Sequence, residues 1–390
     1  MKTTTLLVAT LLAASTGCQG LATPTGAEAP LQTRAPAAAT VSSERDEAAA
    51  STSVAVLDGA PLATTAAPPV PVCDAQPAAR GYYGLYANDA AEQGNVVLTF
   101  DDGPHPKFTP RVLDLLADKK MPATFFVVGR NISRDTYPLI QRIVAEGHTL
   151  GSHSYSHDVR MTNVATPDET VETIRSQHEV TTILIDIALL AESADDFDAM
   201  YRRDFQREPM TWMTGSEVRK AWRGTAERHE ALLAERGFAP GTRPYAVLYS
   251  RPPGGGPYVE HDGAAGIALY DKALTELGMM NVLWHGASGD TVPGQRNDFA
   301  FLTKNMEQYA KKGGVLLIHD YMRPDALEES LTKIGQDGSL RVRTMEDAVQ
   351  KKYACSAGTL GSALTKNQIE DVLFRGFVPA PELEPRLALQ

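Results

Sequence analysis

The chain contains 390 residues, and 48 acidic against 37 basic side chains give it a formal net charge of −11. Because nucleic-acid binding depends on Lys and Arg side chains that neutralise phosphates, this balance argues against a nucleic acid as partner. The length would accommodate two or three average domains, yet the composition indicates a folded region only after about residue 79.

Residues 1–18 have the pattern of an export signal. A basic start leads into an apolar run, Leu6–Ala14, that is too short to span a bilayer as a mature helix. The run ends in Ser15-Thr16-Gly17-Cys18, which resembles the lipobox of bacterial lipoproteins, although Ser15 stands where Leu is usual. We therefore expect an exported cell-envelope lipoprotein whose only membrane attachment is a lipid on Cys18. A plain signal peptide on a secreted protein is the alternative.

Residues 19–79 are rich in Ala, Thr, Pro and Ser. Such a segment buries too little apolar surface to offset its ordering entropy, so we expect a flexible tether. Cys73 and Cys355 bracket the folded region predicted at 80–355, and an exported protein meets an oxidising compartment. We predict a disulfide between Cys73 and Cys355, with two unpaired thiols as the alternative. No role is assigned to the tail, 356–390.

Apolar runs alternate with amphipathic stretches through the folded region. Strands are predicted at 96–100, 123–128, 148–151, 245–249, 281–284 and 314–318, and helices at 110–119, 134–146, 264–277 and 299–312. Alternating strands and helices of this length indicate a parallel sheet with helices outside it. The fold class is therefore α/β, as a distorted or incomplete (β/α) barrel with about seven parallel strands.

One region, from about residue 169 to residue 237, shows helical patterning without a clear strand. Ile183-Leu184-Ile185 is strand-like by itself but sits inside a longer helical run, and 214–236 also has helical spacing. We expect one helix of this region to belong to the barrel and the rest, about 186–240, to form a helical insertion. The insertion is either a connector or a lid over the site.

Five polar motifs follow five of the apolar runs. They are Thr99–Pro104, His153–His157, Arg251–Gly255, Ser288–Asp290 and Leu317–Asp320. Because the carboxyl ends of parallel strands meet at one mouth, we expect these motifs to converge there.

A divalent metal site is predicted from three residues of the first two motifs. His153 and His157 are four residues apart, which suits two imidazoles on one face of a helical turn, and Asp102 can add a carboxylate. Two His and one carboxylate leave coordination positions open, as a catalytic site requires. Mixed N and O ligands favour Zn²⁺, with Co²⁺, Ni²⁺ or Fe²⁺ as alternatives. A lone His pair at this spacing is more often a surface feature.

The remaining polar residues suggest acid–base chemistry. Gly103-Pro104 takes the chain out of strand geometry, so both Asp101 and Asp102 can face the mouth, one as ligand and the other as base. His319 ends a buried apolar run and is a candidate general acid. Arg251 is expected to orient Asp101, and Asp290 to orient His319, although each alone would more often be a structural charge.

Together the five motifs resemble those of the polysaccharide deacetylase family, carbohydrate esterase family four, over about residues 95–352. The resemblance implies a distorted barrel and metal-dependent removal of acetyl groups from an acetylated polysaccharide, with N-acetyl favoured over O-acetyl. It implies that Asp101 is the catalytic base, His319 the acid, and Arg251 and Asp290 their partners. Asp102, His153 and His157 would be the metal ligands. Leu317 would line the pocket of the acetyl methyl group, and the Gly254 N–H would help to bind the oxyanion.

Three departures from the family pattern concern the substrate pocket. Gly254 stands where the family usually has an aromatic residue, Ala287 where it has Asp, and Thr291 where it has Trp. Two alternatives follow, a carbohydrate-binding lipoprotein that has lost catalysis and a metal-dependent amidase for non-sugar substrates. The polymer and the oligomeric state are not indicated by the sequence.

Overall fold

The computed structural model describes residues 84–85, 93–163, 166–209, 211–259 and 263–360. The predicted signal (1–18) and the predicted tether (19–79) lie outside these residues. The same holds for residues 80–83 and 86–92 of the predicted domain and for residues 361–390 of the tail. Cys355 is buried and disulfide-bonded, whereas its predicted partner Cys73 lies outside the described part. None of the described helices is long and apolar enough to cross a bilayer.

The described strands form one parallel sheet in the order β1-β6-β5-β4-β3-β2-β8-β7, and β9 pairs with β2. The strands are β1 (Gly84–Leu85), β2 (Asn95–Asp101), β3 (Thr124–Val127), β4 (Thr149–Ser152), β5 (Tyr249–Ser250), β6 (Met280–Val282), β7 (Gly286–Ala287), β8 (Gly314–His319) and β9 (Arg341–Val342). Within the described residues β1 does not pair with β7, so the barrel is open. This confirms the predicted incomplete parallel barrel. The strands missed in the sequence, β1, β7 and β9, are two residues long.

The centre of the sheet is buried on both faces. Every residue of β8 is buried, and so is every residue of β2 after Asn95. Such continuous apolar runs are typical of parallel strands with helices on their faces. Gly151 in β4 is required by close packing, because a Cβ there would lie 2.6 Å from the Phe126 ring of β3.

The described helices are α1 (Thr109–Lys119), α2 (Tyr137–Ala145), α3 (Pro167–Leu190), α4 (Ala194–Phe205), α5 (Gly215–Glu235), α6 (Gly263–Glu276), α7 (Phe299–Lys312), α8 (Pro324–Gln336) and α9 (Met345–Tyr353), with short 3₁₀ turns η1 (Gly129–Asn131) and η2 (Pro253–Gly255). Helices α1, α2, α6 and α7 largely match their predicted ranges, whereas α8 and α9 were not predicted from the sequence. Residues 245–248, predicted as strand, are irregular, and only Tyr249–Ser250 pairs in the sheet.

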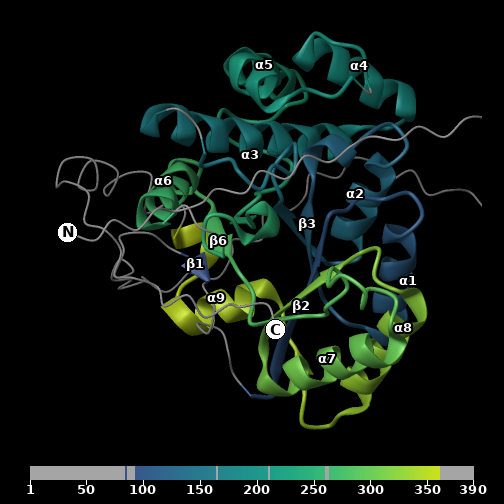
Figure 1. Ribbon diagram of the computed structural model, residues 1–390. Helices are drawn as coiled ribbons and strands as arrows, with labels where there is room; N and C mark the ends of the chain where they lie inside the picture. The colour runs from purple at the N-terminus through teal and green to yellow at the C-terminus, as the bar shows by residue number, and fades with distance from the viewer. Residues whose placement is uncertain (1–83, 86–92, 164–165, 210, 260–262, 361–390) are drawn as a thin grey trace, which may run out of the picture. The chain divides into compact units, whose positions relative to one another are not determined.

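The predicted helical insertion consists of α4 and α5. Helix α3 contacts α2 and α6 of the barrel, and α4 and α5 pack on its other side, as Figure 1 shows. The strand-like run Ile183-Leu184-Ile185 lies in α3 and is buried throughout, because this helix is covered on both sides. Since α3 continues to Leu190, the added helices begin after the predicted starting point of about 186.

Candidate metal and acid–base site

The five predicted motifs lie at the carboxyl ends of β2, β4, β5, β7 and β8. With β3 between β4 and β2, these strands form one continuous stretch of the sheet. Asp101 and His319 are register partners across β2 and β8, and Ser152 and Ser250 are partners across β4 and β5. The motifs therefore open onto one edge of the sheet, as the sequence predicted.

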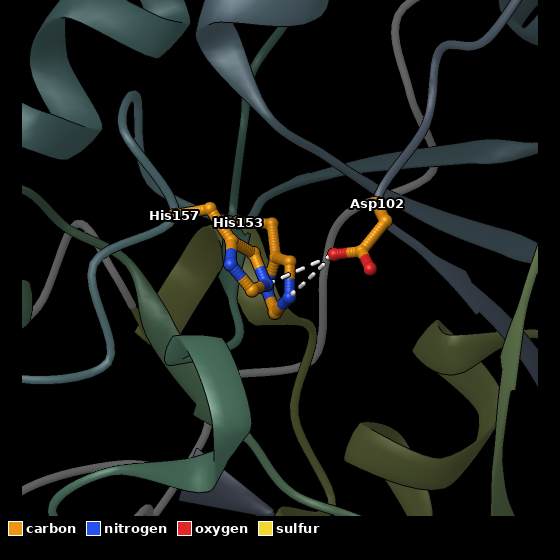
Figure 2. A group of neighbouring side chains, drawn as sticks. All are labelled: Asp102, His153 and His157. Carbon is orange, nitrogen blue, oxygen red and sulfur yellow. Dashed lines mark ion pairs between the residues drawn. The ribbon is translucent and has the colours of Figure 1, made fainter. Parts of the chain in front are cut away.

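Asp102, His153 and His157 form a group whose candidate ligand atoms all lie within 4.8 Å of one another. The Nε2 atoms of His157 and His153 lie 3.0 and 3.5 Å from Asp102 Oδ1, and Figure 2 shows the three side chains pointing toward one another. Asp102 Oδ1 is buried and faces both Nε2 atoms. A buried carboxylate oxygen facing two imidazole nitrogens fits a bound cation, so the group can hold a divalent metal.

The second nitrogen of His153 fixes the orientation of this ligand candidate. His153 Nδ1 donates a hydrogen bond of 2.8 Å to the Arg251 carbonyl oxygen, which leaves the Nε2 lone pair facing Asp102. Burial lowers the pKa of His153 despite the nearby Asp101 and Asp102 carboxylates, so the imidazole is neutral at pH 7. A neutral imidazole whose other nitrogen is anchored is the usual form of a metal-binding histidine.

Asp102 reaches the group because the backbone turns sharply there. Its φ of 73° lies in the left-handed region, directly after β2 ends at Asp101, and its carbonyl oxygen accepts a hydrogen bond of 2.8 Å from Asn131 Nδ2. Burial alone would raise the pKa of Asp102. However, the hydrogen bond from His157 and the electrostatic interactions with His153 and His319 lower the pKa well below its ordinary value, so the carboxylate stays ionised.

The loop that carries the two histidines is not helical, which corrects the predicted helical turn. Residues 153–158 are irregular, and Ser154 and His157 have positive φ values of 64° and 54°. The His157 amide donates to Ser154 Oγ at 3.1 Å, and the Ser156 amide donates to Gln177 Oε1 of α3 at 2.8 Å. The imidazoles therefore converge through a hydrogen-bonded loop rather than through helical periodicity.

Asp101 and Arg251 form a buried ion pair, as predicted. Arg251 Nη1 lies 2.7 Å from Asp101 Oδ1 and also donates to Thr99 Oγ1, while Arg251 Nε donates to the Val282 carbonyl oxygen. The guanidinium is fully buried, 4.2 Å from the centroid of the Phe126 ring. With its position fixed from several sides, Arg251 holds one Asp101 oxygen and leaves Oδ2 facing His153 at 3.7 Å.

His319 and Asp290 also lie together. His319 Nδ1 lies 2.8 Å from Asp290 Oδ1, and its Nε2 lies 3.9 Å from Asp102 Oδ2. Burial alone would lower the pKa of His319. The hydrogen bond to Asp290 and the charges of Asp290, Asp101 and Asp102 outweigh burial and raise the pKa of His319 to about 9. An imidazole of this kind is protonated at neutral pH and can donate a proton.

The three positions that depart from the family pattern surround the same mouth. Gly254 is exposed with φ 61°, and a Cβ there would lie 3.1 Å from Val159 Cγ1. Ala287 on β7 is half-buried and Thr291 is exposed, whereas Leu317, which is not one of the three, is buried on β8. The Trp284 ring lies 5.7 Å from the Arg251 guanidinium, and its Cη2 atom would lie 2.7 Å from a Cβ at Gly255.

Several residues near the site were not identified in the sequence. Tyr321 stacks on the His319 ring with centroids 5.0 Å apart. Burial, followed by the Asp102 and Asp290 charges, raises the pKa of Tyr321. His178 of α3 is buried, contacts Ser152 Oγ and the Tyr270 hydroxyl at 2.8 Å each, and has a pKa lowered by burial to about 3. The place of Tyr321 directly after the fifth motif is the sequence signal that could have indicated it. The residues around His178 carry no comparable signal.

Comparison with known proteins relates one segment of the chain to a protein family. Residues 88–186 match the model of the polysaccharide deacetylase family. A chitooligosaccharide deacetylase of Sinorhizobium fredii is 54% identical over 63 residues, and a peptidoglycan-N-acetylglucosamine deacetylase of Bacillus cereus is 47% identical over 62 residues. Each alignment covers 16% of this chain and 29% of the relative, so the chain spans under a third of these relatives' length.

A solved structure, the peptidoglycan deacetylase PdaC from Bacillus subtilis, is 23% identical with a TM-score of 0.42 and covers 67% of this chain and 93% of its own. The family match spans β2 to most of α3 and contains Asp101, Asp102, His153 and His157. It confirms the resemblance seen in the first two motifs. Residues 88–186 are therefore identified as a segment of the polysaccharide deacetylase family.

Proposed function

We propose that this protein removes acetyl groups from a polysaccharide in a metal-dependent hydrolysis, with N-acetyl groups of amino sugars as the preferred target. The observation that carries the proposal is the arrangement of three polar groups at one sheet edge. These are the possible metal group, the Asp101–Arg251 pair, and the Asp290–His319 pair. The names of the Sinorhizobium and Bacillus relatives support an N-acetylated sugar as substrate.

Asp102, His153 and His157 would hold the metal, with Zn²⁺ preferred for a mixed N and O ligand set. When bound, a divalent cation supplies Lewis-acid polarisation of the acetyl carbonyl and activation of water. The protonation states of two of these residues suit metal binding before the metal is present. Asp102 is ionised and His153 is neutral, so neither needs to lose a proton at neutral pH.

Asp101 would accept the proton of the attacking water. Arg251 occupies one carboxylate oxygen at 2.7 Å, which fixes the orientation of the other oxygen toward the possible metal group. His319 would donate a proton from Nε2 to the departing sugar nitrogen, because Nδ1 is engaged by Asp290. The base and the acid therefore stand on neighbouring strands, β2 and β8, at directly paired positions.

The Gly254 N–H and the Leu317 side chain would complete the site. The backbone N–H would stabilise the developing oxyanion, and Leu317 would contact the acetyl methyl group. Because Gly254 carries no side chain and Thr291 is exposed, this mouth lacks two aromatic walls that the family pattern would place there. We therefore expect that contacts outside the motifs also hold the substrate.

Acetate release from four polymers tests the proposal. The full-length protein is loaded with Zn²⁺ and incubated with peptidoglycan, chitin oligomers, acetylated xylan and an acetylated exopolysaccharide. We expect release from at least one N-acetylated polymer, and Asp101→Asn should lower turnover by about 10²- to 10⁴-fold, the usual contribution of a general base. Metal content of the variant should stay equal to that of the parent protein.

The same experiment separates the alternatives. Polymer binding without acetate release would favour the carbohydrate-binding lipoprotein, to which the altered third and fourth motifs point. Acetate release from small amides, with none from any polymer, would favour an amidase. Equal loss of turnover and of metal in Asp101→Asn would contradict the separate roles given to Asp101 and Asp102.

We also propose that the protein is exported and attached to the cell envelope through a lipid on Cys18. The support is the sequence pattern of residues 1–18, which lie outside the described residues. Metabolic labelling with a radioactive fatty acid tests it, with Cys18→Ala as control. Labelling that persists in Cys18→Ala, or is absent from both proteins, would favour a plain secreted protein.

A further inference from the structure

Trp212 lies exposed on the segment between α4 and α5. Its exposed fraction is 66%, whereas the other two tryptophans of the chain, Trp222 and Trp284, are each 8% exposed. The Arg130 guanidinium lies 5.7 Å from the centroid of the Trp212 ring. An indole left open to this extent, with a cation over it, is typical of a binding surface rather than of a folding core.

Hydrogen bonds join the Trp212 segment to the loop of the two histidines. The amide of Met213, the next residue, donates to the Tyr155 hydroxyl at 3.1 Å, and Tyr155 lies between His153 and His157 in the chain. Tyr155 is buried, so this contact is held inside the structure rather than at its surface. The segment between α4 and α5 therefore contacts the loop that carries His153 and His157.

Arg130 makes a second connection between Trp212 and the site. It belongs to η1, which follows β3, and its amide donates to the Tyr155 carbonyl oxygen at 3.0 Å. In the same turn, Asn131 Nδ2 donates to the Asp102 carbonyl oxygen at 2.8 Å. The cation that covers the indole is thus one residue away from a direct contact with Asp102.

Trp212 borders a small pocket between η1 and the insertion. The pocket has a volume of about 20 Å³ and is lined by residues that include Arg130, Tyr155, Leu184, Tyr201 and Trp212. This volume holds about one water molecule, so a sugar ring cannot enter it. The exposed indole, rather than this pocket, is therefore the surface here that a sugar ring can reach.

We propose that Trp212, oriented by Arg130, is a platform on which a pyranose ring of the substrate polymer stacks, next to the acetylated residue. This inference rests on the proposed polysaccharide function. The face of a pyranose ring presents C–H groups, which pack on the apolar, electron-rich face of an indole. The insertion would thereby add a subsite for chain binding beside a mouth whose own motifs lack two aromatic residues.

Binding and kinetics with Trp212 variants test the platform. Binding of a hexamer of β-1,4-linked N-acetylglucosamine is measured by tryptophan fluorescence and by calorimetry in the full-length Asp101→Asn protein, so the result does not depend on turnover. Trp212→Ala should weaken hexamer binding about tenfold, the loss expected for an aromatic anchor, and Trp212→Phe should retain most of it. The fluorescence change on binding should disappear in both variants.

A matched control comes from the same insertion. Arg223 of α5 lies over the ring of Trp222 and is exposed, but it does not line the pocket. Arg223→Ala should bind the hexamer as the parent protein does. In the active protein, Trp212→Ala should raise KM for the hexamer much more than for the trimer, whereas a purely structural role would change kcat for both equally.

The results that overturn the platform differ from those that overturn the proposed function. Hexamer affinity within twofold of the parent in Trp212→Ala, or an equal loss in Arg223→Ala, contradicts the platform. If no acetate is released but hexamer binding still requires Trp212, the deacetylase function is contradicted. The carbohydrate-binding site at Trp212 would then remain.

Discussion

His319 and Asp290 are joined by two hydrogen bonds of 2.8 Å each. One Asp290 oxygen accepts from the imidazole Nδ1, and the other accepts from the backbone N–H of His319. The carboxylate thus fixes both the ring and the strand end that carries it. This double contact gives the candidate acid a defined orientation and a pKa raised to about 9.

We predict that Asp290→Asn moves the alkaline limb of the pH–activity profile to lower pH. An acid must be protonated, so activity should be present below the pKa of His319 and be lost as pH rises through about 9. Removing the carboxylate charge should lower that pKa by about 1 to 3 units. The check is kcat measured from pH 6 to 10, with Asp118→Asn on the exposed face of α1 as control. An unshifted limb in Asp290→Asn would remove His319 from the role of acid.

We predict that His157→Ala lowers metal affinity more than about 100-fold. Loss of a residue that merely hydrogen-bonds to a metal ligand already lowers metal affinity about 10- to 100-fold, so loss of a ligand should cost more. The measurement is competition with a chromophoric chelator in the full-length protein. His105→Ala is the matched control, since His105 is exposed, lies close to Asp102 in the chain and is not part of the possible metal group. Affinity in His157→Ala within a few-fold of the control would refute the ligand role.

We predict that Arg251→Met destabilises the protein by about 3–5 kcal/mol, because it leaves the Asp101 charge buried without a partner. The double variant with Asp101→Asn should lose less than the sum of the two single losses. Denaturant titration provides the free energies of unfolding. As control, Arg203→Met breaks an exposed pair with Glu235, which should cost at most about 1 kcal/mol. Additive losses in the double variant would speak against the buried pair.

We predict that His229 makes the stability of the insertion fall as pH rises. His229 of α5 is buried between Asp204 of α4 at 2.7 Å and Asp186 of α3 at 3.2 Å. Burial alone would lower its pKa, but the hydrogen bonds and charges of these two carboxylates raise it. A raised pKa means that the stabilisation is complete below about pH 6.5 and is lost as pH rises through the folded-state value.

Hydrogen exchange of α4 and α5 between pH 6 and 9 tests this prediction. Arg243 also contacts Asp186, at 2.8 Å, so this carboxylate keeps a charged partner when His229 is neutral. We therefore expect loosening of the two helices rather than unfolding. His229→Gln should remove the pH dependence, and Arg203→Gln on the exposed side of α4 should retain it. The same slope in His229→Gln would rule out His229 as its source.

The barrel and the meeting of the five motifs were predictable because both depend on local patterns. Apolar runs such as 314–318 define buried strands, and polar residues at the ends of parallel strands must meet. The short strands β1, β7 and β9 were missed because two residues carry no periodicity. Residues 245–248 were assigned to a strand on β-branched and aromatic content, although only Tyr249–Ser250 finds a partner.

Details of the site depend on contacts between distant segments, which the sequence does not display. The spacing of His153 and His157 suggested a helical turn, but two positive φ values bring the rings together instead. Trp212 is 55 residues from His157 in the chain, and the contacts of Met213 and Arg130 with Tyr155 reveal how the two segments meet. The apolar run Ile183–Ile185 of α3 is buried because α4 and α5 cover the side of this helix that faces away from the barrel.

The contact between Val159 and the Gly254–Gly256 turn bears on any attempt to engineer this mouth. A Cβ at Gly254 would lie 3.1 Å from Val159 Cγ1, and one at Gly256 would lie 2.6 Å from the Val159 carbonyl oxygen. An aromatic residue restored at position 254 would therefore need the Val159 side chain, two residues after His157, to move aside, and it would also have to adopt the positive φ of 61°.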